Sequence, residues 1–404
     1  MTQASTASSF PTDPTDPTDP TGPAAGSAGG SGPAAPIPGS APAGSVPAAG
    51  SASAAGSASA AGSVSAAGSA AGSGPGGGTG RPSSALIAAA AAPPWLRYVL
   101  LAVGLVVLLW LPNGLYPAVA VDILCWGLFA VAVDLLLGFT GLMSFGHAAF
   151  WGGSAYVTGL VAVHLGLPFP AAVLAGALAA ALLAVPIGYL AVKRTGIYFA
   201  MVTLAFAQMV YAIANVWRGV TGGENGLQSI PRELGGLDLS DEYYFYYAAL
   251  PIVLIGLFLA WRVVHSPFGR VLVGIRDNPA RARALGYPVH RYKLIAFVLS
   301  AFLAGLGGGL FAVGHQFVSL DVLHWTTSGQ AVIMVVLGGI GTLWGGVLGA
   351  AILVRLSDWL SFSGFEEIGL VTGGIFVLVV LLFRRGLWGT VALLARRWLS
   401  RRAG

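Results

Sequence analysis

Ser144 and His147 are the pair of residues whose types and spacing come nearest to catalytic chemistry in this chain. In a serine hydrolase a histidine accepts the proton of the serine hydroxyl, and an acid orients the histidine. The sequence offers this pair no orienting acid and no Gly-x-Ser-x-Gly elbow, and it has no His-Glu-x-x-His metal motif. We therefore expect no enzyme active site, and we interpret His147 as a hydrogen-bonding group of a core or of a transport pathway.

Two carboxylates, Asp122 and Asp134, lie in long apolar runs. A charged group at the centre of a membrane helix costs roughly 2.5–3.5 kcal/mol on insertion scales, so such residues favour a functional hypothesis. An ion- or proton-coupled secondary transporter could use either one as its coupling carboxylate. Asp134 is near the end of its segment, where solvent could reach it instead.

Metal, redox and nucleotide chemistry have no sequence signature here. The single cysteine, Cys125, can form no internal disulfide and belongs to no ligand spacing, so we expect no metal site. No Gly-x-x-x-x-Gly-Lys-Ser/Thr phosphate loop is present. We expect the chain to bind no cofactor and to have no ATPase site of its own.

The composition indicates a protein that crosses a membrane many times. Of the 404 residues, 56% are hydrophobic and only 9% are charged, whereas soluble domains carry roughly 25% charge. The net charge of +5 is better explained by sorting of basic residues across a membrane than by nucleic acid binding. Runs long enough to be spans, at about 20 residues each, occur at 96–113, 117–137, 145–165, 168–191, 196–217, 243–263, 293–315, 328–356 and 367–383.

The chain divides into three regions by composition. Residues 1–94 consist of Asp-Pro-Thr and Gly/Ala/Ser/Pro repeats, with too little to bury to offset the entropy of ordering. We expect this region to be a disordered tail rather than a signal peptide. Residues 95–390 form the predicted transmembrane domain, with a cytoplasmic loop at 264–293. Residues 391–404 form a basic tail that we expect in the cytoplasm.

Basic residues predict the orientation, because they favour the cytoplasmic side. They gather at Lys193 and Arg194, in the loop 264–293 and at the C-terminal end, whereas the loop 218–243 is mainly acidic. Both termini are therefore expected inside, which requires an even number of crossings. Segment 328–356 exceeds one span and is interrupted by glycines, so it should either enter and return as a hairpin or cross twice. About eight to ten spans result.

Glycine-broken segments are predicted near 138–153 and 338–349, one in each half of the membrane domain. Paired breaks of this kind often mark a transporter's substrate site; close packing of helices is the alternative. The pathway hypothesis selects these candidates: Ser144, Gly146, His147, Thr203, Gln208, Gly339 and Gly341.

The loop 264–293 carries the signals of a short helix. Asn278 is a good N-cap and Pro279 a good first residue. Gly286 suits the C′ position, and Pro288 prevents continuation. The surrounding basic residues would meet an acidic partner or lipid headgroups, although a purely topogenic loop is the alternative. The residues expected to make this contact are Asn278, Pro279, Arg281, Arg283, Ala284, Leu285 and Gly286.

Three stretches, in order along residues 97–390, resemble the LivM-type permease subunits of branched-chain amino acid ABC importers. They are Leu-Leu-Gly-Phe-Thr-Gly to Ala-Phe at 136–150, Gly-Ile-Tyr-Phe-Ala-Met to Asn-Gly-Leu at 196–227, and Ser-Pro-Phe-Gly-Arg to Thr-Leu-Trp-Gly at 266–345. The chain departs from the family at Asp134, where asparagine is usual, and in its long region 1–94.

The resemblance implies an all-α polytopic helical bundle in the bacterial cytoplasmic membrane. It implies ABC ATPase subunits that use ATP, a second permease subunit and an extracytoplasmic substrate-binding protein as partners. The implied substrates are leucine, isoleucine and valine, with urea or a short amide as the alternative that similar permeases carry. The short helix at 279–285 would then couple ATP hydrolysis to transport.

Overall fold

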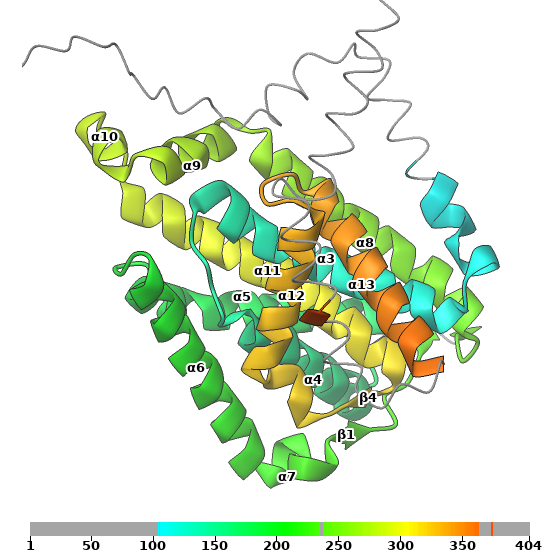
Figure 1. The fold of residues 1–404 in the computed structure, drawn as a ribbon. Helices are drawn as coiled ribbons and strands as arrows, with labels where there is room; N and C mark the ends of the chain where they lie inside the picture. Colours follow the sequence, from blue (N-terminus) through cyan, green and yellow to red (C-terminus); the bar gives the residue numbers. More distant parts are fainter. Residues whose placement is uncertain (1–103, 105, 235–236, 363–372, 375–404) are drawn as a thin grey trace, which may run out of the picture. The chain divides into compact units, whose positions relative to one another are not determined.

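The computed structural model describes residues 104, 106–234, 237–362 and 373–374 (Figure 1). Within this part, six helices are long and apolar enough to cross a membrane. These six are α3 (Pro117–Thr140), α4 (His147–Leu165), α5 (Phe169–Ala191), α6 (Ile197–Val216), α8 (Glu242–Val264) and α11 (Val289–His315). The predicted polytopic helical membrane fold is confirmed. The eight to ten expected spans include 96–113 and 367–383, of which the structure describes only 104, 106–113 and 373–374.

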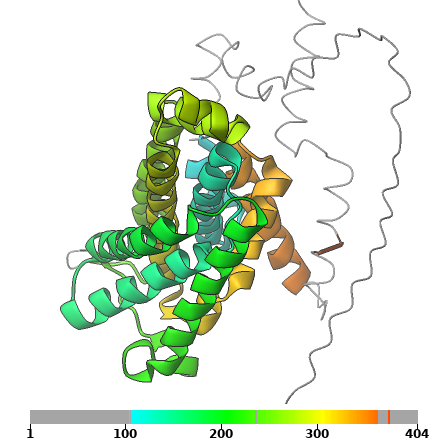
Figure 2. The same cartoon turned by 90° about the vertical axis from the view of Figure 1, so that its left-hand side faces the viewer.

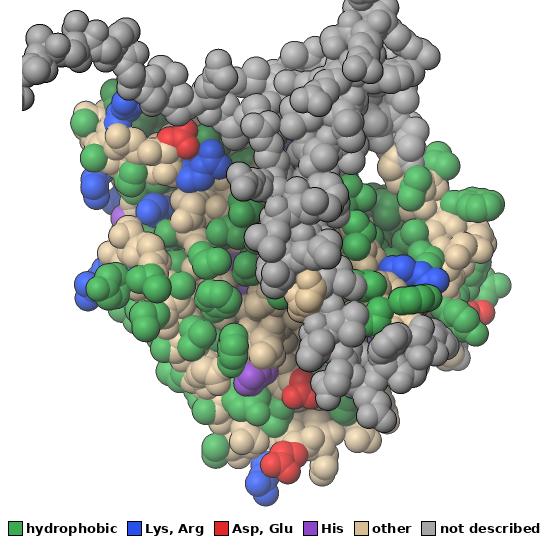
Figure 3. All heavy atoms as spheres, viewed as in Figure 1, with side chains coloured by type: hydrophobic (Ala, Val, Ile, Leu, Met, Phe, Trp, Pro, Cys, Tyr) green, Lys and Arg blue, Asp and Glu red, His purple; other side chains and the backbone are tan. Residues whose placement is uncertain are grey.

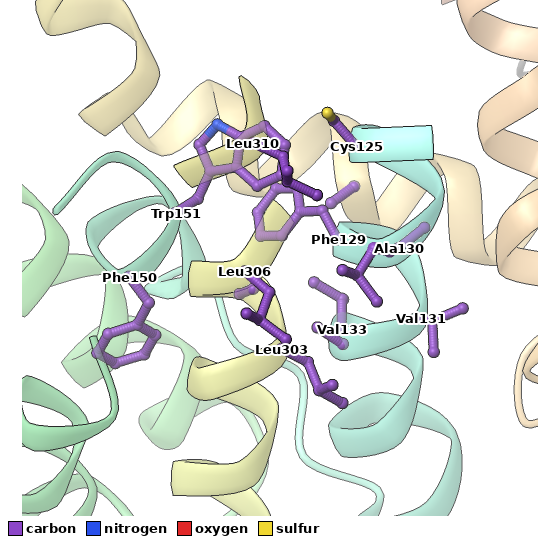
Figure 4. Packing of buried hydrophobic residues seen from close by; sticks show 14 of the residues in the cluster. Cys125, Phe129, Ala130, Val131, Val133, Phe150, Trp151, Leu303, Leu306 and Leu310 are labelled. Atoms are coloured by element: carbon purple, nitrogen blue, oxygen red, sulfur yellow. The ribbon is translucent and has the colours of Figure 1, made fainter. Parts of the chain in front are cut away.

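The centre of the bundle is formed by α3 and α11 (Figures 1 and 2). The most apolar window of α3 is 83% buried, against 28% for α6, so α3 is surrounded by protein and α6 lies at the periphery. Aromatic and aliphatic side chains, among them Phe129, Trp151 and Leu306, pack between the central helices and α4 (Figure 4). The rings of Phe129 and Trp151 lie 4.5 Å apart, and Phe311 is 5.5 Å from Trp151. These two ring contacts join α3, α4 and α11.

The glycine-rich segment 328–356 is a helical hairpin. Helix α12 (Trp325–Gly338) and helix α13 (Trp344–Phe362) are separated by five residues. Their backbones touch, since a Cβ on Gly338 would meet the carbonyl of Gly345 and one on Gly349 would meet the carbonyl of Met334. These two pairings run in opposite directions along the two helices, so the helices are antiparallel. An antiparallel hairpin fits both expected arrangements of this segment, entry with return and two crossings.

Short elements close the two ends of the bundle (Figure 1). One end holds α7 (Arg218–Thr221), the 3₁₀ turns Gly223–Asn225 and Leu320–Leu323, and strand β1 (Leu227–Gln228) paired antiparallel with β4 (Phe317–Val318). A second antiparallel pair is β2 (Glu233–Leu234) with β3 (Leu237–Asp238). The opposite end holds α9 (Pro267–Asp277) and α10 (Pro279–Ala284). The loops predicted to lie on opposite sides of the membrane thus lie at opposite ends.

Charge follows the same division on the molecular surface. Figure 3 shows Lys and Arg side chains gathered over α9 and α10, while hydrophobic side chains dominate the flank over α6. On α6 the exposed residues include Ile197, Tyr198, Met201 and Ile213. An apolar flank with a basic end is what a lipid environment and the positive-inside tendency favour.

Several predicted boundaries were wrong in detail. The first break is confined to 141–146, because residues 138–140 complete α3 and 147–153 begin α4. The second break is confined to 339–343. Helix α11 starts at Val289 rather than 293, so Lys293 is a buried helical residue. The loop 264–293 contains α9 in addition to the predicted α10.

Candidate functional site

A buried polar cluster lies where α4 begins. We call it the His147 cluster, and it comprises His147, Ser300 and Ser328. The His147 Nε2 is 2.7 Å from the hydroxyl of Ser300, which donates to the carbonyl of Ala132 at 2.5 Å. The Ser328 hydroxyl accepts the backbone N–H of Ala148 at 2.7 Å. Three helices from distant parts of the chain, α11, α3 and α12, are thereby joined to the first turn of α4.

Ser144 and His147 do not form a catalytic pair. The Ser144 hydroxyl accepts the backbone N–H of Gly146 at 3.2 Å, while the His147 ring is bonded to Ser300 instead. Both rings that flank His147 edge-on are apolar, Phe150 at 5.7 Å and Phe297 at 5.9 Å. With no carboxylate hydrogen-bonded to this imidazole among the described residues, the geometry favours a role in packing or in a pathway over proton transfer.

Two further pathway candidates, Gly146 and Thr203, lie next to the His147 cluster, whereas Gln208 lies further along α6. A Cβ on Gly146 would lie 2.7 Å from the carbonyl of Thr203, so the break before α4 packs directly on α6. Thr203 is fully buried and donates to the carbonyl of Ala200 at 2.9 Å. Gln208 is five residues further along α6, about 7.5 Å along the axis. Its Nε2 is buried and has no hydrogen-bond partner in the described part of the chain.

Asp134 holds the break of the hairpin, and the expectation that solvent reaches this carboxylate was wrong. Its side chain is fully buried. One carboxylate oxygen accepts the N–H of Gly341 at 2.7 Å and the other accepts the N–H of Leu343 at 3.0 Å. Leu343 has φ 54°, a left-handed conformation that is uncommon for a residue with a side chain. A carboxylate with two backbone donors compensates that cost and fixes the shape of the break.

The pathway candidates Gly339 and Gly341 belong to the hairpin break that Asp134 holds, not to the His147 cluster. Both have positive φ, 119° and 76°, which ends α12. Thr342 closes the break: its hydroxyl donates to the carbonyl of Gly339 at 2.7 Å and accepts the N–H of Gly345 at 3.1 Å. The two sequence breaks are therefore built by different contacts.

Asp122, the other carboxylate of α3, pairs with His315 at the end of α11. The distance is 3.5 Å, and the two side chains are 27% and 42% exposed. The His315 ring stacks on Phe311 at 4.1 Å. Each carboxylate considered for ion coupling thus has a protein partner.

The predicted short helix is present as α10. The Asn278 side chain accepts the N–H of Arg281 at 3.0 Å, as an N-cap should. At the other end, Gly286 has φ 85°, its N–H donates to the carbonyl of Arg283 at 2.9 Å, and the N–H of Tyr287 donates to Ala282 at 3.1 Å. This pair of bonds is the Schellman motif.

The capping bonds of α10 use the Asn278 side chain and backbone groups, so the arginine side chains of the helix are free of them and lie on the surface. Arg281, Arg283, Ala284 and Leu285 are exposed, with Leu285 at 71%, whereas Ala282 packs inward against Ile275 and Val289. An exposed leucine next to exposed arginines is suited to a protein contact, because apolar area and complementary charge both contribute there.

Two residues of the His147 cluster, Ser300 and Ser328, had no clear signal in the sequence. Asp134 stood out as a carboxylate in an apolar run, but no sequence pattern indicated that it binds the hairpin break. Serines in apolar helices are frequent, and only a fold in three dimensions shows which backbone group each one meets.

Among the described residues, no cluster of three or more His, Cys, Asp or Glu could hold a metal ion.

The fold and these contacts define a class: a polytopic helical membrane protein with two glycine-broken segments and a capped basic helix at one end. Residues 116–383 match the model of the family described as "Branched-chain amino acid transport system / permease component". This match covers most of the chain, and the chain belongs to that family.

The individual proteins whose sequences resemble this chain are permeases as well. The permease protein LivM of the high-affinity branched-chain amino acid transport system of Escherichia coli (strain K12) is 30% identical over 284 residues, which is 64% of this chain and 67% of LivM. The guanosine ABC transporter permease NupQ of Bacillus subtilis is 33% identical over 34% of this chain and 42% of its own length. The autoinducer 2 permease LsrC of Klebsiella pneumoniae is 34% identical over 40% of this chain and 52% of its own.

Proposed function

We propose that this chain is the LivM-type permease subunit of a bacterial ABC importer, and that it carries leucine, isoleucine and valine across the cytoplasmic membrane. The observation that supports the substrate class is the likeness to LivM, which extends over 64% of this chain, against 34% for NupQ and 40% for LsrC. A nucleoside or another small polar solute, urea included, is the competing substrate class within the same transport mechanism.

The proposed mechanism is alternating access driven by partner subunits. A substrate-binding protein delivers the amino acid at the end that carries α7 and the β1–β4 pair. A second permease subunit completes the pathway, and ATPase subunits dock at α10 on the cytoplasmic side. Because ATP binds the closed ATPase dimer more tightly than the open one, it biases the permease toward the conformation that fits the closed dimer.

The feature that favours an ABC permease over an ion-coupled transporter is α10. It is only six residues long, yet it is capped at both ends and presents Arg281 and Arg283 outward. A secondary transporter has no need of such an element. One of the two candidate coupling carboxylates is also committed, because both Asp134 oxygens accept backbone N–H groups that fix the hairpin.

The experiment is to purify the tagged chain from its host with the proteins bound to it, and to compare Arg281→Glu/Arg283→Glu with Arg281→Lys/Arg283→Lys. The Glu pair reverses charge on an exposed contact surface, so the ATPase should be lost from the complex. The Lys pair keeps the charge and should retain it. Proteoliposomes of the parent complex should take up leucine when ATP is supplied, and excess isoleucine or valine should compete where guanosine and urea do not. Leucine uptake driven by an ion gradient without ATP would refute the proposal.

A further inference from the structure

Arg276 connects the cytoplasmic end of the molecule to both glycine-broken segments. It is near the end of α9, two residues before the Asn278 cap of α10. Its guanidinium Nη1 donates to the carbonyl of Gly138 in the last turn of α3. Its aliphatic stem covers Gly141, the first residue of the first break, where an added Cβ would lie 2.9 Å from the Arg276 Cγ.

The carbonyl of Gly138 is suited to this contact. The last four carbonyls of a helix have no partner inside the helix, and a cation at that end is favourable. At the end of α3, the N–H groups of Gly141 and Leu142 are both used by the carbonyl of Leu136. An arginine from a different helix therefore satisfies the carbonyl of Gly138.

Gly138 is also where the hairpin break touches α3. A Cβ on Gly138 would lie 2.4 Å from an oxygen of Asp134, 2.5 Å from the N of Gly341 and 2.6 Å from its Cα. In turn, a Cβ on Gly341 would lie 3.8 Å from the Nη1 of Arg276. We call these four residues, Asp134, Gly138, Arg276 and Gly341, the Gly138 joint.

The joint lies on a short mechanical route from α10. Asn278 is the C-cap of α9 and the N-cap of α10, and the two helices pack together through Ile275 and Ala282, which share one buried cluster with Val289. Leu272 and Ile275 are the buried face of α9, and Ser266 caps its start by accepting the N–H of Gly269 at 3.4 Å. A displacement of α10 should therefore displace Arg276, whose stem lies against Gly141 in the first break and whose Nη1 lies near Gly341 in the second.

We propose that the Gly138 joint transmits the movement of α10 to the α12–α13 hairpin, with Arg276 as the positioning residue between them. This inference rests on the proposed ABC function and adds to it the path by which an ATPase outside the membrane changes the conformation of the glycine-broken segments. Docking and transmission are then separate tasks: Arg281 and Arg283 hold the ATPase, whereas Arg276 passes on the movement.

The test separates these tasks with three variants in the purified complex reconstituted in proteoliposomes. Arg276→Met removes the donor but keeps an aliphatic stem over Gly141. Arg276→Lys keeps a charge and one donor. Arg270→Met is the matched control, because Arg270 is an exposed arginine of the same helix for which the structure gives no side-chain hydrogen bond. The measurements are ATPase co-purification, the rate of ATP hydrolysis and the amount of leucine taken up per ATP.

Arg276→Met should retain the ATPase and hydrolyse ATP, but its uptake per ATP should fall by roughly fivefold or more, the lower range of an allosteric coupling. Arg276→Lys should recover part of the ratio, and Arg270→Met should match the parent. An unchanged ratio in Arg276→Met would overturn the inference, as would loss of the ATPase from both Arg276 variants, which would make Arg276 a docking or folding residue. If the parent complex itself shows no ATP-driven uptake, the proposed function fails instead.

Discussion

Replacing Gly138 by alanine tests the close contact between α3 and the hairpin break. The new methyl group would lie 2.4–2.6 Å from an Asp134 oxygen and from the Gly341 backbone, whereas carbon contacts are most favourable at about 3.5–4.0 Å. Two of the three nearest atoms are backbone atoms of Gly341. The break must therefore move by roughly 1 Å to restore ordinary contact distances.

That movement has a calculable cost. Overpacking in a well-filled site costs about 1–3 kcal/mol. The 2.7 Å bond from the Gly341 N–H to Asp134 would also be weakened, and hydrogen bonds to charged groups contribute about 1.5–3 kcal/mol. A loss of about 3 kcal/mol is expected, which for a domain of about 300 residues corresponds to a fall of roughly 5 °C in melting temperature.

Gly274→Ala is the matched control for that variant. Gly274 is inside α9, and a Cβ there would meet no atom within 4 Å. Alanine in a helix interior is favoured over glycine by about 0.5–1 kcal/mol, so this variant should be as stable as the parent or slightly more stable. The assay is thermal unfolding in detergent, followed by leucine uptake at matched expression. A Gly138→Ala protein that melts with the parent, or a Gly274→Ala protein that loses as much, would refute the reasoning.

Three further predictions concern topology, the tail and α10. In a variant without the native cysteine, single cysteines at Ser240 and Ala284 should react with impermeant reagents from opposite sides of the membrane; reaction of both from outside would contradict the orientation. Deletion of residues 2–90 should leave uptake unchanged at matched expression, since that composition cannot form a core, and complete loss would show a further role. Gly286→Val should weaken ATPase co-purification, because φ 85° strains a β-branched residue; unaltered co-purification and coupling would argue against α10 as the contact.

The membrane fold could be predicted because its causes are local in the sequence. Apolar runs of about 20 residues must be helical in lipid, where every backbone group needs an internal partner. The caps of α10 were also local, since Asn278, Pro279 and Gly286 each act on residues within one turn. The run of glycines in 328–356 also predicted a break there, and an antiparallel pair of helices fits both of the expected arrangements.

The site was harder to predict because its contacts join residues far apart in the chain. Asp134 meets Gly341 across 207 positions, and His147 meets Ser300 across 153. No spacing rule covers such pairs. Solvent exposure was one of two alternatives for Asp134 because it is close to a helix end, but the hairpin break binds this carboxylate and it is fully buried. The pathway candidates were likewise chosen as one group, whereas the structure places Gly146, His147 and Thr203 together where α4 begins and Gly339 and Gly341 in the hairpin break.

The central claim is that this chain moves branched-chain amino acids when a partner ATPase hydrolyses ATP. The most direct measurement is uptake of radiolabelled leucine into proteoliposomes that contain the purified complex, with the substrate-binding protein outside and ATP supplied to the ATPase side. The account predicts uptake that requires ATP, that isoleucine and valine inhibit, and that Arg281→Glu/Arg283→Glu abolishes. Uptake that persists without ATP, or ATP-driven uptake of guanosine but not of leucine, would contradict it.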